Sequence, residues 1–521
     1  GAPYVGDLLI NGDKIVGLGP AAKAQGRTEI DAVGLAVAPG FINMLSWANE
    51  TLIADGRGQS DVRQGVTLEV MGEGTSMGPL NPEMKRLRTE RQGDIKYSVD
   101  WTSFGEYFDW LTRRGVSPNV ASFVGATTVR IHELGEGDVD PTPEQLQRMR
   151  GLVRQAMDEG AMGVGSSLIY APANFAETPE LIALASEAGR CGGMYISHMR
   201  DEGPKLLEAI DELIEISAKS GAPAEIYHFK QSGRENWRKI DAAIARVEAA
   251  RAKGQRITAD MYTYPASSTG FDAAMPLWIQ AGGIEQWVKR LKDPKLRAKA
   301  MKEMREPDAS ENTSLAVREP DKVILVGFKT AELKPLTGRT LGEVARERGK
   351  PPEEVIADLI VADNSRIQVV YFSMSEENVA RAVALPWMSF GSDAGAQAPE
   401  GVFLKSSTHP RAYGNFARLL GKYVRDEKRV PLAEAVRRMT SLPAANLGIK
   451  DRGALKPGFH ADIAIFDPNK IADAATFAKP QQYAVGMRHV LVNGVPVVRD
   501  GEHTGATPGR FVKGPGAGRC R

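Results

Sequence analysis

The stretch Met194-Tyr195-Ile196-Ser197-His198-Met199-Arg200-Asp201-Glu202-Gly203 determines how the rest of the sequence is interpreted. Its apolar and hydroxyl-bearing start predicts a short buried strand that ends at His198, and the charged residues after it predict a loop. Ala224-Glu225-Ile226-Tyr227-His228-Phe229-Lys230 repeats this pattern, and residues 205–219 between them carry apolar side chains at helical spacing. A strand, helix and strand of these lengths form a right-handed unit with parallel strands. Both histidines should therefore lie at the carboxyl ends of neighbouring strands, where α/β folds bind ligands.

The middle of the chain continues this alternation of strand and helix. The helix Pro143–Glu159 is a clear example, because its apolar residues share one face and Thr142 can cap its start. Eight such strands interleaved with helices predict an α/β fold, a (β/α)8 TIM-like barrel. The predicted strands lie at residues 35–43, 66–72, 120–125, 162–167, 194–198, 224–230, 257–264 and 387–393.

The gap between the seventh and eighth strands is too long for a loop. We interpret residues 270–325, with a charged helix at 284–304, as an inserted small subdomain that could act as a lid. Asn-Gly turns join short apolar strands both near residue 11 and near residue 493. We therefore expect the two ends, 1–38 and 445–521, to form one small β-sandwich beside the barrel at 39–444.

Composition excludes several classes of function. Lys and Arg number 66 against 65 Asp and Glu, so the formal net charge of +1 gives no basic field for nucleic acid. No uncharged apolar run reaches the ~18 residues that a membrane span needs. We therefore expect a small-molecule substrate, with a homo-oligomer as an alternative to a monomer.

The two cysteines, Cys191 and Cys520, are too few for a disulfide framework, and we expect Cys520 to lie in a frayed tail. Residues 1–5 lack an initiator Met, so we expect an earlier strand or a signal peptide to have been removed. A cytoplasmic location is the first expectation and a periplasmic one the alternative.

The ends of four barrel strands carry residues suited to metal chemistry. His198 and His228 supply two imidazoles at one rim, Glu73 lies between Gly72 and Gly74 after the second strand, and Asp393 follows the last strand. Two histidines and one glutamate on a metal, with a free aspartate as general base and acid, form an arrangement for metal-assisted hydrolysis.

Each of these residues also has a structural interpretation. A single histidine at a strand end is more often a hydrogen-bonded rim residue than a ligand, but two on consecutive strands with a later aspartate reverse that balance. Glu73 could instead cap the following turn. Of the remaining histidines only His409 stands out.

Several motifs follow one another along nearly the whole chain. They are Ala38-Pro39-Gly40-Phe41-Ile42-Asn43, Ser197-His198-Met199-Arg200-Asp201-Glu202, His228-Phe229-Lys230, Gly391-Ser392-Asp393, His409-Pro410-Arg411 with Gly414, and Gly458-Phe459-His460-Ala461-Asp462. In this order they resemble the motifs of the N-acyl-D-amino-acid deacylases, or D-aminoacylases, of the amidohydrolase superfamily. That resemblance implies a (β/α)8 barrel, a β-sandwich from both termini, a small domain inserted after strand seven, and zinc-dependent hydrolysis of an amide.

The resemblance also implies roles for particular residues. His198 and His228 would ligate zinc and Asp393 would be the general base and acid. The clamp on the substrate α-carboxylate would consist of Lys230, Tyr262, Ser268 and Arg411, which supply cationic and hydroxyl donors. Two of these residues have structural alternatives: Lys230 could pair with Glu202, and Arg411 could brace the last loop.

Two departures from the family pattern concern the metal. The superfamily's first strand normally ends in His-x-His, but here Leu45 and Trp47 occupy those positions. D-aminoacylases carry a cysteine ligand in a Gly-Asn-Cys-Gly turn, where this chain has Gly72-Glu73-Gly74. We therefore expect one tightly bound Zn²⁺ rather than two ions, on Glu73, His198 and His228. An oxygen ligand should hold it less tightly than a thiolate would and make it a stronger Lewis acid.

The first functional hypothesis is hydrolysis of the acyl amide of N-acyl-D-amino acids to a carboxylate and a free D-amino acid. A dipeptidase, or another linear or cyclic amidase with the same centre, is an enzymatic alternative. A non-catalytic barrel that has lost its metal is the alternative from another class. The joint presence of His198, His228 and Asp393 argues against that last reading.

Overall fold

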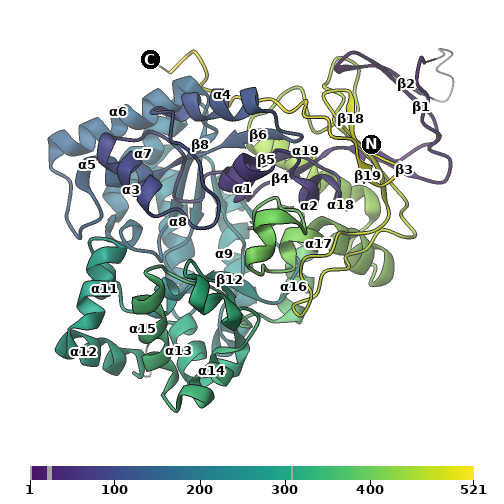
Figure 1. The fold of residues 1–521 in the computed structure, drawn as a ribbon. Coiled ribbons are helices and arrows are strands. Elements are labelled where there is room, and N and C mark those ends of the chain that lie inside the picture. The colour runs from purple at the N-terminus through teal and green to yellow at the C-terminus, as the bar shows by residue number, and fades with distance from the viewer. Residues whose placement is uncertain (1–2, 20–25, 307–308, 521) are drawn as a thin grey trace.

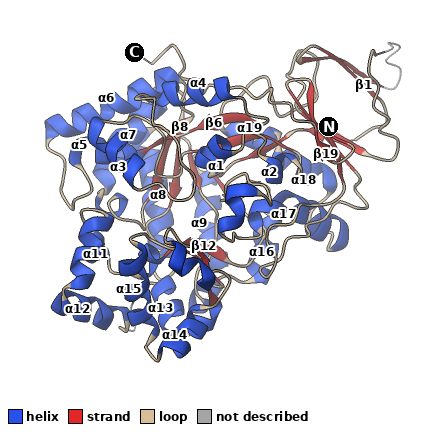
Figure 2. Ribbon diagram, in the orientation of Figure 1, coloured by secondary structure: helices blue, strands red, loops and turns tan. Residues whose placement is uncertain are grey.

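The computed structural model describes residues 3–19, 26–306 and 309–520, and a barrel of parallel strands occupies its centre (Figures 1 and 2). Two sheets make up this barrel. They join where the Met162 N–H donates to the Ser122 carbonyl at 2.9 Å and where the Met44 N–H donates to the Phe390 carbonyl at 3.0 Å. The predicted (β/α)8 barrel is confirmed. Its strands are β4 (Phe41–Asn43), β5 (Val66–Met71), β6 (Asn119–Ser122) continued by β7 (Val124–Gly125), β8 (Gly163–Ser167), β9 (Met194–His198), β10 (Ala224–Ile226), β11 (Ile257–Met261) and β15 (Met388–Phe390).

Helices surround the barrel, and most of them bury apolar residues against it. In α6 (Pro143–Glu159) the Thr142 side chain accepts from the Gln145 N–H, as the sequence predicted, and Gly221 ends α8 (Leu206–Ser220) with a φ of +74°. No helix in the described ranges is both long and apolar enough to cross a membrane. The surrounding helices are α1 (Ala48–Ala54), α2 (Gln59–Val62), α3 (Pro82–Glu90), α4 (Phe104–Arg114), α5 (Ala126–Leu134), α6 (Pro143–Glu159), α7 (Thr178–Arg190), α8 (Leu206–Ser220), α9 (Ile240–Ala252), α16 (Glu376–Val383), α17 (Arg411–Arg418), α18 (Leu432–Met439) and α19 (Ser441–Asn446).

The first predicted strand, at 35–43, is divided between two sheets. Its first half, β3 (Ala36–Pro39), pairs with the terminal sheet, and β4 pairs with β5 in the barrel. Gly40 lies at the break, where a Cβ atom would come within 2.1 Å of the Thr67 hydroxyl oxygen. The chain therefore crosses between the two sheets where only glycine fits.

Both ends of the chain build the β-sandwich that lies at one side of the barrel (Figures 1 and 2). The N-terminal hairpin packs on the five-stranded sheet around an apolar core that includes Ile15, Ile463 and Leu491. The predicted Asn493-Gly494 turn joins two of its strands with φ angles of +50° and +79°. The strands are β1 (Asp7–Asn11), β2 (Lys14–Gly19), β3, β16 (Ile463–Phe466), β17 (Met487–Val492), β18 (Val495–Arg499) and β19 (Glu502–His503). The expectation of a removed earlier segment was based on residues 1–5, of which Gly1 and Ala2 lie outside the described residues.

A second body with its own apolar core lies between β11 and β15. Its core runs from Phe271 to Tyr371, so the segment expected at 270–325 is only the first part of this unit. The predicted helix 284–304 is two helices, because Pro294 interrupts it and the Asp293 side chain caps the second one. The elements are β12 (Ser267–Gly270), α10 (Leu277–Gln280), α11 (Ile284–Lys292), α12 (Pro294–Met304), α13 (Glu311–Arg318), β13 (Val323–Gly327), α14 (Leu341–Arg348), α15 (Pro352–Asp363) and β14 (Gln368–Tyr371).

The C-terminal segment corrects the prediction about the cysteines. It runs along the amino ends of the barrel strands, where the Val512 N–H donates to the Val120 carbonyl at 2.8 Å. Cys520 forms a disulfide with Cys191, with Cα atoms 5.6 Å apart, and is 7% exposed. Cys520 therefore lies in an anchored segment rather than in a frayed tail.

Candidate active site

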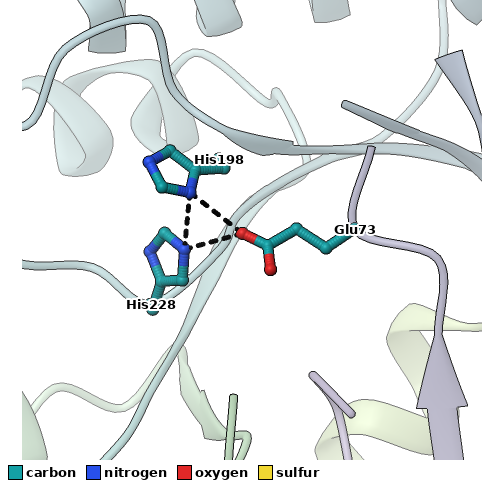
Figure 3. Close-up of side chains that lie close together, drawn as sticks. All are labelled: Glu73, His198 and His228. Atoms are coloured by element: carbon teal, nitrogen blue, oxygen red, sulfur yellow. Dashed lines mark hydrogen bonds and ion pairs between the residues drawn. The ribbon is translucent and has the colours of Figure 1, made fainter. Parts of the chain in front are cut away.

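Three potential metal ligands converge at the carboxyl end of the barrel (Figure 3). His198 is the last residue of β9, and His228 follows β10 with a φ of +38°. Its backbone N–H donates to the Asp260 carboxylate at 2.8 Å, which stabilises this uncommon conformation. Glu73 follows β5 between two glycines with positive φ, and a Cβ on Gly74 would lie 1.9 Å from the Ser167 hydroxyl oxygen. The glycines therefore let the backbone beside Glu73 approach β8 closely.

The donor atoms of these three residues point at one another. Glu73 Oε1 lies 3.0 Å from His198 Nδ1 and 2.8 Å from His228 Nε2, and the two nitrogens are 3.0 Å apart (Figure 3). Ligands in a tetrahedron around zinc, with bonds of ~2.0–2.1 Å, lie about 3.3 Å from one another. The ligand atoms would need to separate by only a few tenths of an ångström to hold such an ion. The residues present therefore fit a single divalent metal.

Electrostatics favour a cation at the same point. Burial raises the pKa of Glu73, but the imidazoles of His228 and His198 outweigh it and hold that pKa below its usual range. Burial and Lys230 lower the pKa of His228, but the carboxylates of Glu202 and Glu73 raise it to about 10. A site that favours a protonated imidazole so strongly is a site that attracts a positive ion.

Glu202 lies behind the two histidines and contacts both. Its Oε1 is 2.9 Å from His228 Nδ1, and its Oε2 is 3.7 Å from His198 Nε2. Lys230 Nζ lies 2.5 Å from the same Oε1 and 2.7 Å from His228 Nδ1. All four side chains are buried. Of the two alternatives for Lys230, the ion pair with Glu202 is therefore present.

Asp393 lies beside the three ligands at the end of the last barrel strand. Like His228 it has a positive φ, +50°, and its backbone N–H donates to the Leu45 carbonyl at 2.9 Å. Its Oδ2 lies 2.8 Å from Arg411 Nη1, and its Oδ1 accepts from the indole N–H of Trp47 at 3.1 Å. Burial raises the pKa of Asp393; Arg411 opposes this and Glu73 adds to it, so the net shift is upward. A carboxylate with a raised pKa is a better base than an ordinary aspartate.

The four residues expected to clamp the substrate carboxylate are neighbours. The Arg411 guanidinium lies 4.5 Å from the centre of the Tyr262 ring, and Lys230 Nζ lies 5.7 Å from it. Arg411 Nη2 also donates to the Ser268 carbonyl at 3.2 Å, whereas the Ser268 hydroxyl donates to the Val369 carbonyl at 2.9 Å. The guanidinium Nε is buried and has no hydrogen-bond partner within the described part of the chain, so Arg411 keeps a free donor.

His409 has a structural role in this site. Its Nε2 lies 3.0 Å from the Ala266 carbonyl, and its Nδ1 accepts the backbone N–H of Arg411 at 2.9 Å. Burial lowers the pKa of His409 well below its usual range, and Arg411 adds to this, so the ring is neutral. The neutral ring holds the start of α17 and so positions Arg411.

Sequence reasoning missed one member of the site. The sequence indicates only that Trp47 cannot bind metal. In the structure its indole N–H donates to Glu73 Oε2 at 2.9 Å as well as to Asp393. Its place at the end of the first barrel strand was the available signal, because strand ends at this rim carry the chemistry.

Comparisons with known proteins agree with this geometry. The amidohydrolase family matches residues 28–498. D-aminoacylase of Alcaligenes xylosoxydans xylosoxydans is 32% identical over 514 residues, which cover 97% of this chain and 93% of the relative. A D-aminoacylase structure, described as having a binuclear metal centre with one-metal activation and second-metal attenuation, is similar with a TM-score of 0.80 and 30% identity, over 98% of this chain and 96% of that one. N-acyl-D-glutamate deacylase from Bordetella bronchiseptica, complexed with zinc and a phosphonate inhibitor, is similar with a TM-score of 0.78 and 27% identity, again over 98% and 96%.

Proposed function

The chain belongs to the D-aminoacylase group of the amidohydrolase family, and from this premise we propose that it hydrolyses the acyl amide bond of N-acyl-D-amino acids. The products are a carboxylate and a free D-amino acid. One observation carries the proposal: a glutamate and two histidines converge on a single point, and Asp393, whose side chain is 11% exposed, lies beside them.

The metal in this proposal is one Zn²⁺, held by Glu73, His198 and His228. Two nitrogens and one oxygen are a donor set typical of catalytic zinc. A zinc ion there supplies Lewis-acid chemistry, because it polarises a carbonyl oxygen and lowers the pKa of water. The zinc in the similar N-acyl-D-glutamate deacylase structure supports this choice of metal.

The proton transfers fall to Asp393. Its carboxylate takes the proton of the attacking water and delivers it to the amide nitrogen as the C–N bond breaks. Arg411 at 2.8 Å keeps the carboxylate ionised despite its burial, and the Trp47 N–H fixes its other oxygen. The aspartate is thus held in one orientation through both transfers.

Arg411, Tyr262, Lys230 and Ser268 form the wall that receives the substrate α-carboxylate in this proposal. Arg411 is the main anchor, because its guanidinium retains a buried donor after pairing with Asp393. Lys230 already pairs with Glu202, so it adds positive potential from behind the wall. An arginine shared between the base and the substrate carboxylate would place the amide beside Asp393.

The inserted body shapes the space above the metal ligands in this proposal and acts as a lid. The Tyr170 ring lies 5.2 Å from the His198 ring, and its hydroxyl hydrogen-bonds the Thr269 hydroxyl of β12 at 2.7 Å. Tyr170 therefore links the inserted body to the metal ligand His198. The division into a β-sandwich of 1–38 and 445–521 and a barrel of 39–444 is part of the same proposal.

Two further expectations concern the cellular compartment of the protein and its oligomeric state. The Cys191–Cys520 disulfide supports the periplasmic alternative over a cytoplasmic location, because disulfides persist in oxidising compartments. Self-association stays a prediction, which light scattering of the purified chain would test.

The direct test measures amine release from a panel of N-acetyl-D- and N-acetyl-L-amino acids, dipeptides and cyclic amides. The protein is purified without chelator, and its metal content is measured on the same samples. We expect one zinc per chain and turnover of N-acetyl-D-amino acids that stops when the metal is removed and returns when zinc is added. Preference for dipeptides or cyclic amides would replace this proposal with the amidase alternative. A metal-free, inactive protein would support the non-catalytic barrel.

A further inference from the structure

The indole of Trp47 bridges two carboxylates of the active site. Its Nε1–H donates to Glu73 Oε2 at 2.9 Å and to Asp393 Oδ1 at 3.1 Å. The backbone holds the residue at the rim, because the Trp47 N–H donates to the Ala394 carbonyl at 3.0 Å. The side chain of Leu45, two residues earlier, is fully buried and lies in the apolar core.

The two oxygens that accept from the indole, Glu73 Oε2 and Asp393 Oδ1, are not among the ligand atoms of the first metal. Glu73 directs Oε1 toward His198 and His228 and leaves Oε2 on the other side of its carboxylate (Figure 3). A second cation would bind between this Oε2 and the Asp393 carboxylate, because divalent cations bind where two carboxylate oxygens lie close together. The indole N–H already lies between them. The indole nitrogen is a hydrogen-bond donor without an available lone pair, so it can hydrogen-bond both carboxylates but cannot bind a metal.

We infer that Trp47 takes the place of a second metal ion and fixes the centre as mononuclear. The inference rests on the proposed function and extends it to the number of metals and to their effect on the rate. The similar D-aminoacylase structure is described with a binuclear centre in which the second metal attenuates activity. In this chain the indole N–H holds the Glu73 and Asp393 carboxylates together without a cation. Excess metal therefore has no second binding site, and it does not lower the rate of the reaction.

The experiment counts metal ions and is independent of turnover. Wild type, Trp47→Phe, Trp47→His and the control Trp278→Phe are dialysed to equilibrium against graded zinc, and bound zinc per chain is measured by mass spectrometry. The control is matched because the Trp278 indole N–H also donates to a glutamate, Glu303, but within the inserted body. Circular dichroism shows that each variant is folded.

We expect wild type and Trp278→Phe to reach one zinc per chain and to stay there as zinc rises. Trp47→His should bind a second equivalent, because it adds an imidazole beside two freed carboxylate oxygens. Its kcat should then fall several-fold as zinc rises, whereas the kcat of wild type reaches a plateau. Trp47→Phe should lower kcat about tenfold with little change in KM at low zinc, because Asp393 loses its second partner.

Two results would overturn the inference. In the first, wild type binds two zinc ions per chain and its kcat falls at excess zinc. This result does not depend on whether any variant folds. Alternatively, Trp47→His and Trp47→Phe could match wild type in both stoichiometry and zinc response. Failure of the proposed function has a different signature, because then no variant would bind zinc or release amine at any zinc concentration.

Discussion

The carboxylate of Glu202 lies 2.9 Å from Nδ1 of His228, on the side of the ring that faces away from Glu73. A metal bound through Nε2 requires the lone pair of that nitrogen, so the ring proton must lie on Nδ1 and be donated to Glu202. The same carboxylate also balances the buried Lys230. Glu202 thus orients a metal ligand and compensates a buried charge.

Replacement of Glu202 by Gln should weaken zinc binding by about 10–100-fold, because partners of metal-bound histidines tune their orientation and basicity. Competition with a chromophoric chelator measures the change in Kd. Glu212→Gln is the matched control, since Glu212 pairs with Arg200 on the loop after β9 and does not contact a metal ligand. An unchanged Kd in Glu202→Gln would show that the histidine needs no carboxylate behind it.

The same substitution should also destabilise the fold, because Lys230 is only 3% exposed and would lose its counter-charge. Breaking a buried ion pair from one side costs about 3–5 kcal/mol. The double variant Glu202→Gln with Lys230→Met removes both charges and should recover most of this loss. Urea unfolding of the metal-free proteins measures all the differences. If the double variant is no more stable than the single one, the pair does not govern stability here.

Asp393→Asn should abolish proton transfer and leave the metal centre intact. Positioned acids and bases contribute about 10²–10⁴-fold to rates, so kcat for an N-acetyl-D-amino acid should fall within that range. Zinc content should stay at the wild-type value, because Glu73, His198 and His228 are unchanged. A variant that keeps wild-type kcat would remove Asp393 from the mechanism.

The pH dependence of the reaction should reveal the contact between Arg411 and Asp393. Burial raises the pKa of Asp393 and Arg411 at 2.8 Å opposes this, so removal of the guanidinium should raise that pKa further. The reaction needs the ionised carboxylate, so the acid limb of kcat should move to higher pH in Arg411→Gln. Arg411→Lys keeps the charge and should move the limb much less. Equal limbs in the two variants would contradict this assignment.

The barrel could be predicted from the sequence because its signals are local. The strands are short apolar runs, the helices between them carry apolar residues at helical spacing, and Thr142 caps α6 as its position predicted. The convergence of His198, His228 and Glu73 followed from topology, because carboxyl ends of parallel strands meet at one rim.

The features that could not be predicted depend on contacts between distant segments. The break at Gly40 is imposed by Thr67, which the local apolar pattern at 35–43 does not reveal. The indole of Trp47 reaches Glu73 and Asp393 only after three loops have been brought together. The disulfide joins residues 329 positions apart, and the sequence does not show that two such distant cysteines meet in the folded chain.

Reduction of the Cys191–Cys520 disulfide should loosen the end of the chain but not the barrel. Val512 is held by its backbone bond to Val120, and Phe511 stacks on Phe108 with ring centres 4.3 Å apart, so the segment up to these residues should stay in place. Beyond them the disulfide is the covalent anchor, and we expect faster amide hydrogen exchange at 515–520 after reduction. The thermal midpoint should fall by a few degrees, because the cross-link closes a loop of 329 residues and its loss gives the unfolded chain more conformational freedom. Cys191→Ser should reproduce the reduced protein and should not respond to reductant. If exchange at 515–520 is the same with and without reductant, non-covalent contacts alone hold the C-terminal segment.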